Sequence, residues 1–393
     1  MILTPLFVLG FLGIVLSLTG IIEYYYHQKL VNTIPIRIHV NGTRGKSSVT
    51  RLIAAGLREG GIRTFAKTTG TAPRVIDAFG KDHIIHRLRS PSIGEQVRLL
   101  KYFAQEKPDA VVIECMAVQP QYQWISEHQM VRSNIGVITN VRPDHMEEMG
   151  PTLVDVAYSL CNTIPVDGKL ITGEEIHLEI FRNVAKENGS TFVESNEISI
   201  SDDELNQFSY IEHPMNIAVA LDVCNEAGVE RRIALAGMYK MKPDLGALVA
   251  WNLKKDNRRI QFINGMAAND PVSTLKIWKF VVDRYNGDRG TCVFFNTRDD
   301  RPGRTRQLIE LTLQEIKPDH FIVRGDKIKK PITRVQKHSP NTNIFEIGFN
   351  KNIDFVVDKL LGLSNCTLIY AIGNQVGSGQ EILTKIAKYK RDD

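Results

Sequence analysis

The sequence predicts an α/β protein with an N-terminal transmembrane helix, a larger central domain and a smaller Rossmann-like C-terminal domain. Three observations lead to this prediction: an uncharged stretch at residues 1–22, short apolar runs that alternate with helical patterns, and a glycine-rich loop directly after the first of these runs. The 393 residues are enough for two domains with separate cores, and we expect the boundary near residue 240.

Residues 1–22 are long enough to cross a bilayer as one helix and carry no charged side chain. A cleaved signal peptide normally has a basic start and a small-residue cleavage site, and their absence favours a retained anchor. Lys29 follows the span, so the positive-inside tendency predicts a single-pass protein of the cell membrane with cytoplasmic globular domains. Five widely spread cysteines without paired spacing fit reduced, buried thiols.

The formal net charge of +5 is modest, although the first hundred residues are rich in Arg and Lys. A nucleic-acid binder would be more basic and would interleave aromatic residues, so we expect no nucleic-acid partner. An anionic small molecule or polymer fits better, with a solvated basic face as the alternative.

The glycine-rich loop lies in "VNGTRGKSSVT" (40–50), behind the predicted strand "IPIRIHV" (34–40). A phosphate loop needs glycines where backbone N–H groups approach oxygen atoms, followed by a lysine and a hydroxyl at a helix start. This loop is shorter than the full Walker pattern, and the alternative is a plain turn with a solvated lysine. The residues that we expect to bind nucleotide phosphates are Gly42, Thr43, Arg44, Gly45, Lys46, Ser47 and Ser48.

A helix is predicted after the loop, because apolar residues recur at helical spacing until Gly60 and Gly61 end it. The runs 109–116 and 134–141 are typical of strands buried on both faces of a parallel sheet. A ligand is then expected at the carboxyl ends of these strands.

A magnesium site is predicted from Glu114, which ends the run "AVVIE". A buried carboxylate is costly unless it is paired or coordinates a cation, and Ser47 offers a second hard oxygen. The alternative for Glu114 is a salt bridge to a nearby arginine. His145, beside Asp144 and just past another apolar run, is a further candidate ligand.

The C-terminal domain is predicted after "MKPDLGA" (241–247), which gives the division 1–22, 23–240 and 241–393. The stretch "GNQVGSG" (373–379) has the wrong spacing for a dinucleotide fingerprint and is expected to be a strand-ending loop. We expect four strands, at 258–265, 291–297, 319–325 and 367–373, and helices that include 273–284 and 304–316.

Together these motifs resemble the Mur ligases and folylpolyglutamate synthases, which are ATP-dependent amide-forming enzymes, through "GTRGKS", "KTTGT" (67–71), Glu114 and "TNVRPDHME". The anchor, "TTGTAPR", "SIGEQ", "ECMAVQP", "DHMEEMGPT" and "NGMAANDPVSTLKIWK" resemble the ligase subunits of poly-γ-glutamate synthases (CapB/PgsB type) over nearly the whole chain. The central domain is therefore expected to be a Mur-ligase-like P-loop ATPase.

The resemblance implies site residues. Lys46, Glu114 and His145 would be catalytic, and Ser47, Glu114 and His145 would hold Mg²⁺. Asn216 would approach the adenine of ATP. Arg298, Asp299 and Asn264 would face the nucleotide, with Asp270 as the alternative to Asn264 for the ribose. The substrate would contact Lys67, Thr69, Thr71 and Arg74, and neither Lys169 nor Lys186 can be assigned as the carbamylated lysine of several Mur ligases.

The resemblance also implies the reaction: a carboxylate becomes an acyl phosphate, and glutamate is then coupled to a growing polyglutamate chain. Small membrane-bound partner subunits of a synthase complex are further implied partners. Separately, Gly10, Gly13 and Gly20 of the span could pack against lipid or against a second copy of the chain, so a homo-oligomer is an open alternative. The phosphate loop begins about twenty residues after the span, so we expect no domain for UDP-linked substrates. Two alternatives remain open, a P-loop kinase or phosphotransferase and a nucleotide-regulated membrane scaffold.

Overall fold

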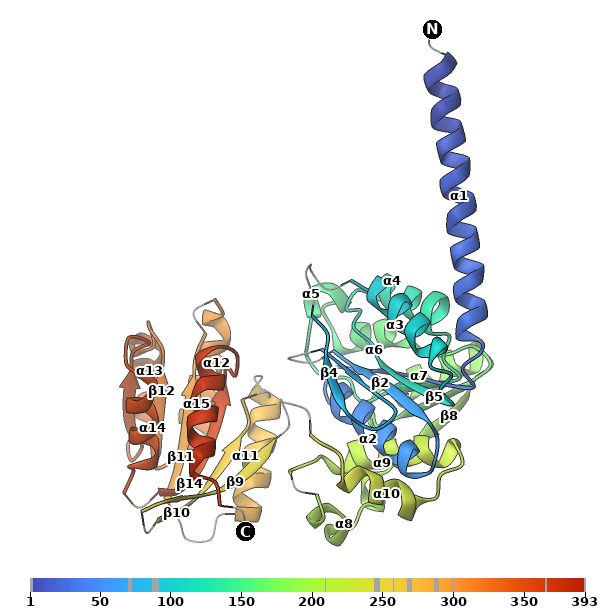
Figure 1. Cartoon of the computed structure of the whole chain (residues 1–393). Helices are drawn as coiled ribbons and strands as arrows, with labels where there is room; N and C mark the ends of the chain where they lie inside the picture. The colour runs from blue at the N-terminus through green and yellow to red at the C-terminus, as the bar shows by residue number, and fades with distance from the viewer. Residues whose placement is uncertain are drawn as a thin grey trace. The chain divides into compact units, whose positions relative to one another are not determined.

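The structure, a computed structural model, describes residues 3–69, 73–86, 92–208, 210–243, 248–256, 258–266, 271–285, 290–298, 300–364 and 366–391. It divides the chain into two compact units, residues 1–245 and 246–393 (Figure 1). Each unit contains one sheet covered by helices, so the α/β class predicted from the sequence is confirmed. The sequence suggested a domain boundary five residues earlier.

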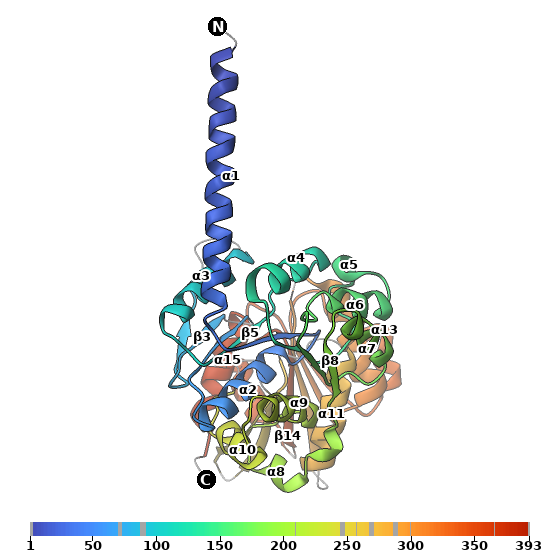
Figure 2. The same cartoon turned by 90° about the vertical axis from the view of Figure 1, so that its right-hand side faces the viewer.

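The N-terminal helix α1 (Leu3–Val31) projects from the first unit and is continuous past residue 22 (Figures 1 and 2). By length and composition, Phe7–Val31 could cross a membrane. The last turns of α1 instead pack on the globular body, where Val31 is fully buried and Gln28 Nε2 donates to Gln129 O at 2.8 Å. One helix therefore joins the exposed apolar segment to the body without an intervening loop.

The first unit contains an eight-stranded sheet of order β4-β3-β2-β5-β1-β6-β7-β8. All its neighbouring strands are parallel except at β3, which is antiparallel to both β2 and β4. The strands are β1 (Ile36–Asn41), β2 (Thr64–Thr68), β3 (Arg74–Ile76), β4 (Asp82–Ile84), β5 (Ala110–Glu114), β6 (Ile135–Ile138), β7 (Lys169–Thr172) and β8 (Thr191–Glu194). The three predicted strands are β1, β5 and β6, and β1 lies between the other two.

Helices cover both faces of this sheet, with α2, α9 and α10 on one face and α3 and α4 on the other (Figures 1 and 2). Close packing of α2 depends on glycine, since a Cβ at Gly237 would lie 2.4 Å from Ala55 O. The helices are α2 (Lys46–Glu59), α3 (Gly94–Gln105), α4 (Pro120–Ile125), α5 (Met146–Met149), α6 (Leu153–Cys161), α7 (Leu178–Glu187), α8 (Asp202–Asn206), α9 (Pro214–Glu226) and α10 (Arg231–Tyr239). A π-helical segment, η1 (Ser126–Val131), follows α4.

The second unit contains a six-stranded sheet of order β13-β12-β11-β14-β10-β9. Its strands are β9 (Val249–Lys255), β10 (Arg258–Asn264), β11 (Gly290–Asn296), β12 (His320–Arg324), β13 (Asn343–Ile347) and β14 (Cys366–Gly373). Its helices are α11 (Pro271–Tyr285), α12 (Pro302–Leu311), α13 (Lys329–Val335), α14 (Ile353–Leu361) and α15 (Ser378–Ile386). The four predicted strands are β10, β11, β12 and β14, whereas β9 and β13 were not predicted. All five cysteines are buried and free.

Candidate active site

The glycine-rich loop connects β1 to α2, and its two glycines adopt backbone conformations that other residues rarely reach. Gly42 has φ +125° and Gly45 has φ +82°. A Cβ at Gly42 would lie 2.1 Å from Thr139 Oγ1, and one at Gly45 would lie 2.8 Å from Asn216 Oδ1. Only glycine fits this close approach to the segments that follow β6 and begin α9. The loop is therefore a backbone cradle of the kind that accommodates phosphate oxygens.

Lys46 begins α2 and folds back over the loop. Its Nζ donates to Gly42 O at 2.6 Å and to Thr43 O at 3.4 Å. The ammonium thus lies directly above the loop backbone, where the phosphates of a nucleotide would be held. Ser47 and Ser48 follow on the same helical turn.

Ser47 and Glu114 lie next to each other, because β5 is the immediate neighbour of β1. Ser47 Oγ donates to Glu114 Oε2 at 2.8 Å, and the backbone N–H of Thr69 donates to the same oxygen at 2.6 Å. Glu114 is only 2% exposed, and in the described parts of the chain it forms no ion pair. The arginine partner considered from the sequence is therefore not seen among these residues. A buried carboxylate beside a hydroxyl, with no ion pair among the residues that the structure describes, fits a hard divalent cation such as Mg²⁺.

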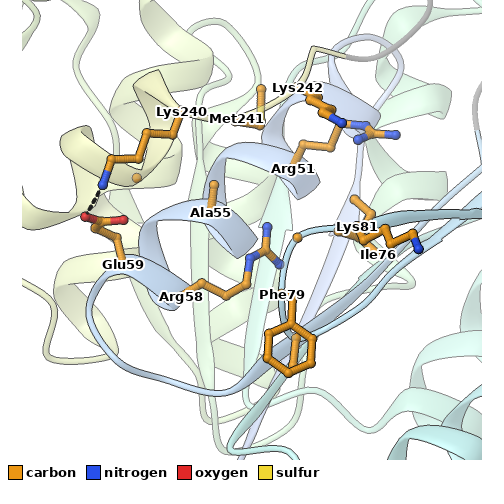
Figure 3. A pocket seen from close by; sticks show the side chains of 13 residues that line it. Arg51, Ala55, Arg58, Glu59, Ile76, Phe79, Lys81, Lys240, Met241 and Lys242 are labelled. Carbon is orange, nitrogen blue, oxygen red and sulfur yellow. Dashed lines mark hydrogen bonds and ion pairs between the residues drawn. The ribbon is translucent and has the colours of Figure 1, made fainter.

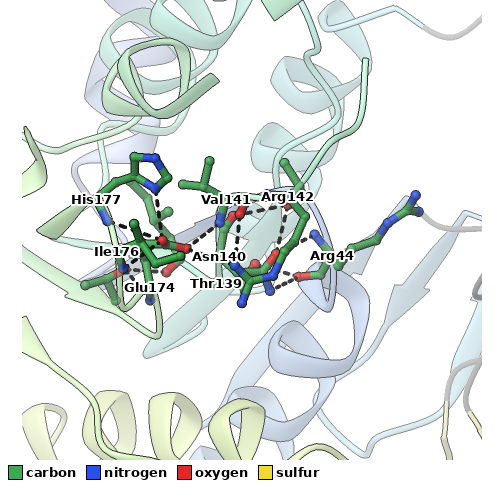
Figure 4. Close-up of polar contacts among 11 residues, drawn as sticks. Arg44, Thr139, Asn140, Val141, Arg142, Glu174, Ile176 and His177 are labelled. Atoms are coloured by element: carbon green, nitrogen blue, oxygen red, sulfur yellow. Dashed lines mark hydrogen bonds and ion pairs between the residues drawn. The ribbon is translucent and has the colours of Figure 1, made fainter. Parts of the chain in front are cut away.

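Asn140 lies in the segment after β6 and holds the glycine-rich loop through hydrogen bonds (Figure 4). This residue was not predicted from the sequence. Its Oδ1 accepts hydrogen bonds from Thr43 Oγ1 (2.8 Å) and from Arg44 N (3.1 Å), and its Nδ2 donates to Arg44 O (3.1 Å). Thr139 Oγ1 donates to the same carbonyl at 2.6 Å. The "TN" after an apolar strand was the only signal in the sequence for this role.

Glu174 extends this hydrogen-bond network beyond Asn140 (Figure 4). It was also not predicted from the sequence. It accepts a hydrogen bond from Val141 N at 2.7 Å and lies 3.0 Å from His177 Nδ1. Burial alone favours the neutral acid, but these hydrogen bonds and the nearby Arg142 hold the pKa of Glu174 below its ordinary value. The ionised carboxylate therefore ties the segment after β6 to the loop after β7.

His145 and Asp144 lie on the segment that follows this network. His145 has φ +47° and is 52% exposed, with Glu148 Oε2 3.7 Å from its Nδ1. Asp144 lies 3.6 Å from Arg44 Nη2. Among the described residues, no hydrogen bond or ion pair joins His145 to Ser47 or Glu114, and no cluster of three acidic, His or Cys residues could hold a metal. The role of His145 as a metal ligand therefore stays a prediction.

Asn216 lies in the first turn of α9, directly against the glycine loop. Its Nδ2 donates to Glu212 Oε1 at 2.8 Å, and His213 N donates to the same oxygen at 3.0 Å. Burial raises the pKa of Glu212, while these hydrogen bonds oppose the shift. Glu212 thus fixes the orientation of Asn216 beside the loop. This role of Glu212 was not predicted from the sequence.

The predicted substrate residues fall in different environments. Lys67 is fully buried, with Nζ 3.3 Å from Glu95 Oε1, so its ammonium is engaged inside the unit. Thr69 contacts Glu114 through its backbone, and Arg74 begins β3 opposite Thr68. Thr71 lies outside the described residues.

The remaining predicted residues lie in the second unit, at the start of β7, or outside the described parts. Asn264 ends β10 and Arg298 follows β11, so both lie at the carboxyl edge of the second sheet, where Arg298 pairs with Asp300 at 2.6 Å. Asp270 and Asp299 lie outside the described residues. Lys169 begins β7, at the opposite edge of the first sheet from the glycine loop, and forms an ion pair with Glu226. This position does not suit a bridging carbamylated lysine.

Comparison with known proteins assigns both units. Residues 40–250 match the Mur ligase middle domain, and residues 251–389 match the poly-gamma-glutamate synthase CapB C-terminal domain. The chain is 36% identical to the capsule biosynthesis protein CapB of Bacillus anthracis over 97% of this chain and 82% of that protein. It is 35% identical to the PGA synthase CapB of Bacillus subtilis over 96% of each.

Solved structures share the fold at low sequence identity. Escherichia coli FolC in complex with ADP superposes with a TM-score of 0.64 and 14% identity over 92% of each chain. MurF from Acinetobacter baumannii superposes with a TM-score of 0.69 and 12% identity, over 92% of this chain and 79% of that one. A folylpolyglutamate synthase/dihydrofolate synthase from Yersinia pestis was solved with AMPPNP and Mn. The chain described here belongs to the CapB family of poly-γ-glutamate synthases, ATP-dependent amide ligases with a Mur ligase middle domain.

Proposed function

We propose that this chain synthesises poly-γ-glutamate by activating a carboxylate with ATP at the loop between β1 and α2. The acceptor carboxylate attacks the γ-phosphorus of ATP, and the bond to ADP breaks to leave an acyl phosphate. The amine of glutamate then attacks the acyl carbon, the carbon–oxygen bond to phosphate breaks, and the amine loses a proton as the amide forms. The hydrogen bond between Ser47 and Glu114 beside the glycine loop carries this proposal.

The residues of the loop perform most of this work by binding and orientation. Lys46 would exchange its hydrogen bonds to the loop carbonyls for the phosphates and neutralise charge that builds on the transferring oxygens. Asn140 keeps the loop carbonyls and N–H groups oriented. Ser47 and Glu114 would hold Mg²⁺, which supplies charge neutralisation at the phosphates when it is bound.

The helix α1 is proposed to anchor the chain in the cell membrane, with both units in the cytoplasm. Its side chains from residue 7 to residue 26 are exposed and mostly apolar, whereas those that follow dock on the body. Small membrane-bound partner subunits of a synthase complex would contact this exposed surface. Resistance of the chain to alkaline extraction, combined with protection of both units from external protease in intact cells, tests this arrangement.

The enzymatic proposal is tested with the detergent-solubilised full chain, ATP, Mg²⁺ and radiolabelled glutamate. We expect ADP and phosphate to be released only when an acceptor is present, together with γ-linked polymer. The variant Lys46→Ala should abolish both, whereas Lys337→Ala, an exposed lysine of the second unit, should leave them unchanged. A stable phosphorylated product would instead indicate a kinase, and polymer synthesis by Lys46→Ala would indicate a scaffold.

A further inference from the structure

A cavity lies in the first unit beside α2 (Figure 3). Its volume is about 460 Å³, which is within the range of small-molecule sites. It is lined by α2, the hairpin that joins β3 to β4, and the end of α10. We call it the basic pocket, because its charged lining consists of Arg51, Arg58, Lys81, Lys240, Lys242 and Glu59.

Two of the five cations are neutralised by carboxylates. Arg51 is 3% exposed and forms a two-pronged pair with Asp82, at 3.0 and 2.9 Å. Lys240 lies 2.5 Å from Glu59 across the junction of α10 and α2 (Figure 3). These ion pairs hold the lining of the pocket in place. The positive charges of Arg51 and Lys240 are therefore already compensated and contribute little to ligand binding.

The other three cations give the pocket an excess of positive charge. In the described parts of the chain, neither Lys81 nor Lys242 forms an ion pair. Burial lowers the pKa of Arg58 to about 10, against the opposing charge of Asp77, so the guanidinium stays charged at neutral pH. Asp77 itself accepts hydrogen bonds from two backbone N–H groups of the hairpin and pairs with His83 at 2.8 Å. The pocket is thus suited to an anion with more than one negative group.

Apolar side chains complete the lining. Ala55, Ile76 and Met241 contribute to the pocket, and Phe79 at the tip of the hairpin is 92% exposed. The lysine ammonium groups of the lining act as separate point charges on flexible stems. This combination fits a ligand in which methylene groups alternate with carboxylates better than it fits one compact phosphate.

We propose that the basic pocket is a second binding site for a run of carboxylates along the poly-γ-glutamate chain, separate from the active site. A γ-linked chain carries two methylene groups and one free α-carboxylate per residue, which matches the apolar and cationic lining. The inference rests on the polymer-forming function proposed above.

Separation from the active site gives this pocket a distinct role. Arg58 lies twelve residues after Lys46 on the same helix, which corresponds to about 18 Å along α2. A chain held at the pocket raises the effective concentration of its own end near the enzyme, as a second linked contact does in any bivalent ligand. The pocket would therefore favour elongation of a long chain over starting a new one.

The test uses the detergent-solubilised full chain and a fluorescent poly-γ-glutamate of about ten residues, with binding followed by anisotropy. Lys81→Glu combined with Lys242→Glu should weaken binding at least tenfold and reduce its salt dependence, because exposed charges are screened by salt. Release of ADP with a two-residue γ-glutamyl acceptor should stay unchanged. The matched control reverses two exposed cations elsewhere, Arg232→Glu with Lys337→Glu, and should bind like the wild type.

Three results would overturn the proposal: wild-type affinity in the pocket variant, equal weakening in the control, or displacement of the label by tripolyphosphate but not by unlabelled poly-γ-glutamate. The last result would identify a phosphate site. Melting temperature checks the fold, and Lys81→Gln with Lys242→Gln replaces the charge reversal if that variant does not fold. If the wild type fails to release ADP, the proposed ligase activity is refuted. The anisotropy measurement still tests binding at the basic pocket independently.

Discussion

Ser47 Oγ and Glu114 Oε2 lie 2.8 Å apart although 67 residues separate them in the chain. The contact exists because β1 and β5 are adjacent and parallel, with Val40 paired to Glu114. The helix that follows β1 then begins beside the end of β5. This geometry places a hydroxyl and a buried carboxylate at one edge of the sheet, next to a loop built for phosphate.

The first prediction concerns the charge of Glu114. Glu114→Gln keeps the shape of the side chain and can keep the hydrogen bonds to Ser47 and Thr69 N, but it removes the negative charge that would hold the metal. We expect ADP release to fall at least about a hundredfold, with a higher requirement for Mg²⁺ or Mn²⁺. Steady-state rates over a metal titration measure this. Glu147→Gln on the exposed start of α5 is the control, and an equal loss there would refute a specific role for Glu114.

The second prediction concerns the hydrogen bonds by which Asn140 holds the phosphate loop. Asn140→Ala removes three hydrogen bonds to Thr43 and Arg44, each of which contributes about 1 kcal/mol. We expect the affinity for ATP to fall about ten- to hundredfold and the melting temperature of the free protein to fall as well, because the same bonds stabilise the fold. Asn140→Asp keeps the acceptor but loses the donor, so it should be intermediate. Calorimetric titration with a non-hydrolysable ATP analogue provides the measurement, and unchanged affinity would contradict the bracing role.

The third prediction concerns Glu212, which orients Asn216 beside the loop. Burial raises the pKa of Glu212, so the neutral amide of Glu212→Gln is an acceptable replacement. We expect this variant to change the free energy of unfolding by less than about 1 kcal/mol, whereas Glu212→Ala leaves Asn216 without its acceptor and weakens ATP binding about tenfold. Parallel denaturant and ATP titrations distinguish the two. Equal ATP affinity in both variants would show that Glu212 does not act through Asn216.

The fourth prediction is a dependence of stability on pH through His39. Its Nδ1 lies 2.7 Å from Glu127 Oε2 inside the first unit. Burial alone would lower the pKa of His39, but the contributions of Cys115 and Glu127 outweigh it and raise the pKa to about 9.

A raised pKa means that the folded state binds the proton more tightly than the unfolded state. The stabilisation is therefore complete below pH 6.5, the ordinary value, and is lost as the pH rises through about 9. The full loss is about 3 kcal/mol in the free energy of unfolding. Denaturant titrations at pH 6, 7.5 and 9 should show this decline in the wild type and a flatter profile in His39→Gln. A decline of the same size in both would assign the effect to other groups.

Features that depend on local order along the chain were predictable from the sequence. The glycines, lysine and hydroxyl of the loop follow one another directly, so their spacing predicts a phosphate loop before a helix. Alternating apolar residues predicted β1, and apolar runs predicted β5, β6 and four strands of the second sheet, because burial on both faces leaves a continuous signal. Composition alone identified the apolar N-terminal helix, although not its continuation to Val31 and its docking on the body.

Contacts between residues far apart in the sequence depend on the fold. Strand order cannot be read from a run of apolar residues, so the contact of Asn140 with Thr43 needed the fold, whereas the sequence had already grouped Ser47 with Glu114. The same holds for the burial of Lys67 against Glu95, which the motif around it had suggested as a substrate contact. The basic pocket combines residues from α2, a hairpin and α10 that share no motif. Charge and burial act through space, and only folding brings such groups within reach of one another.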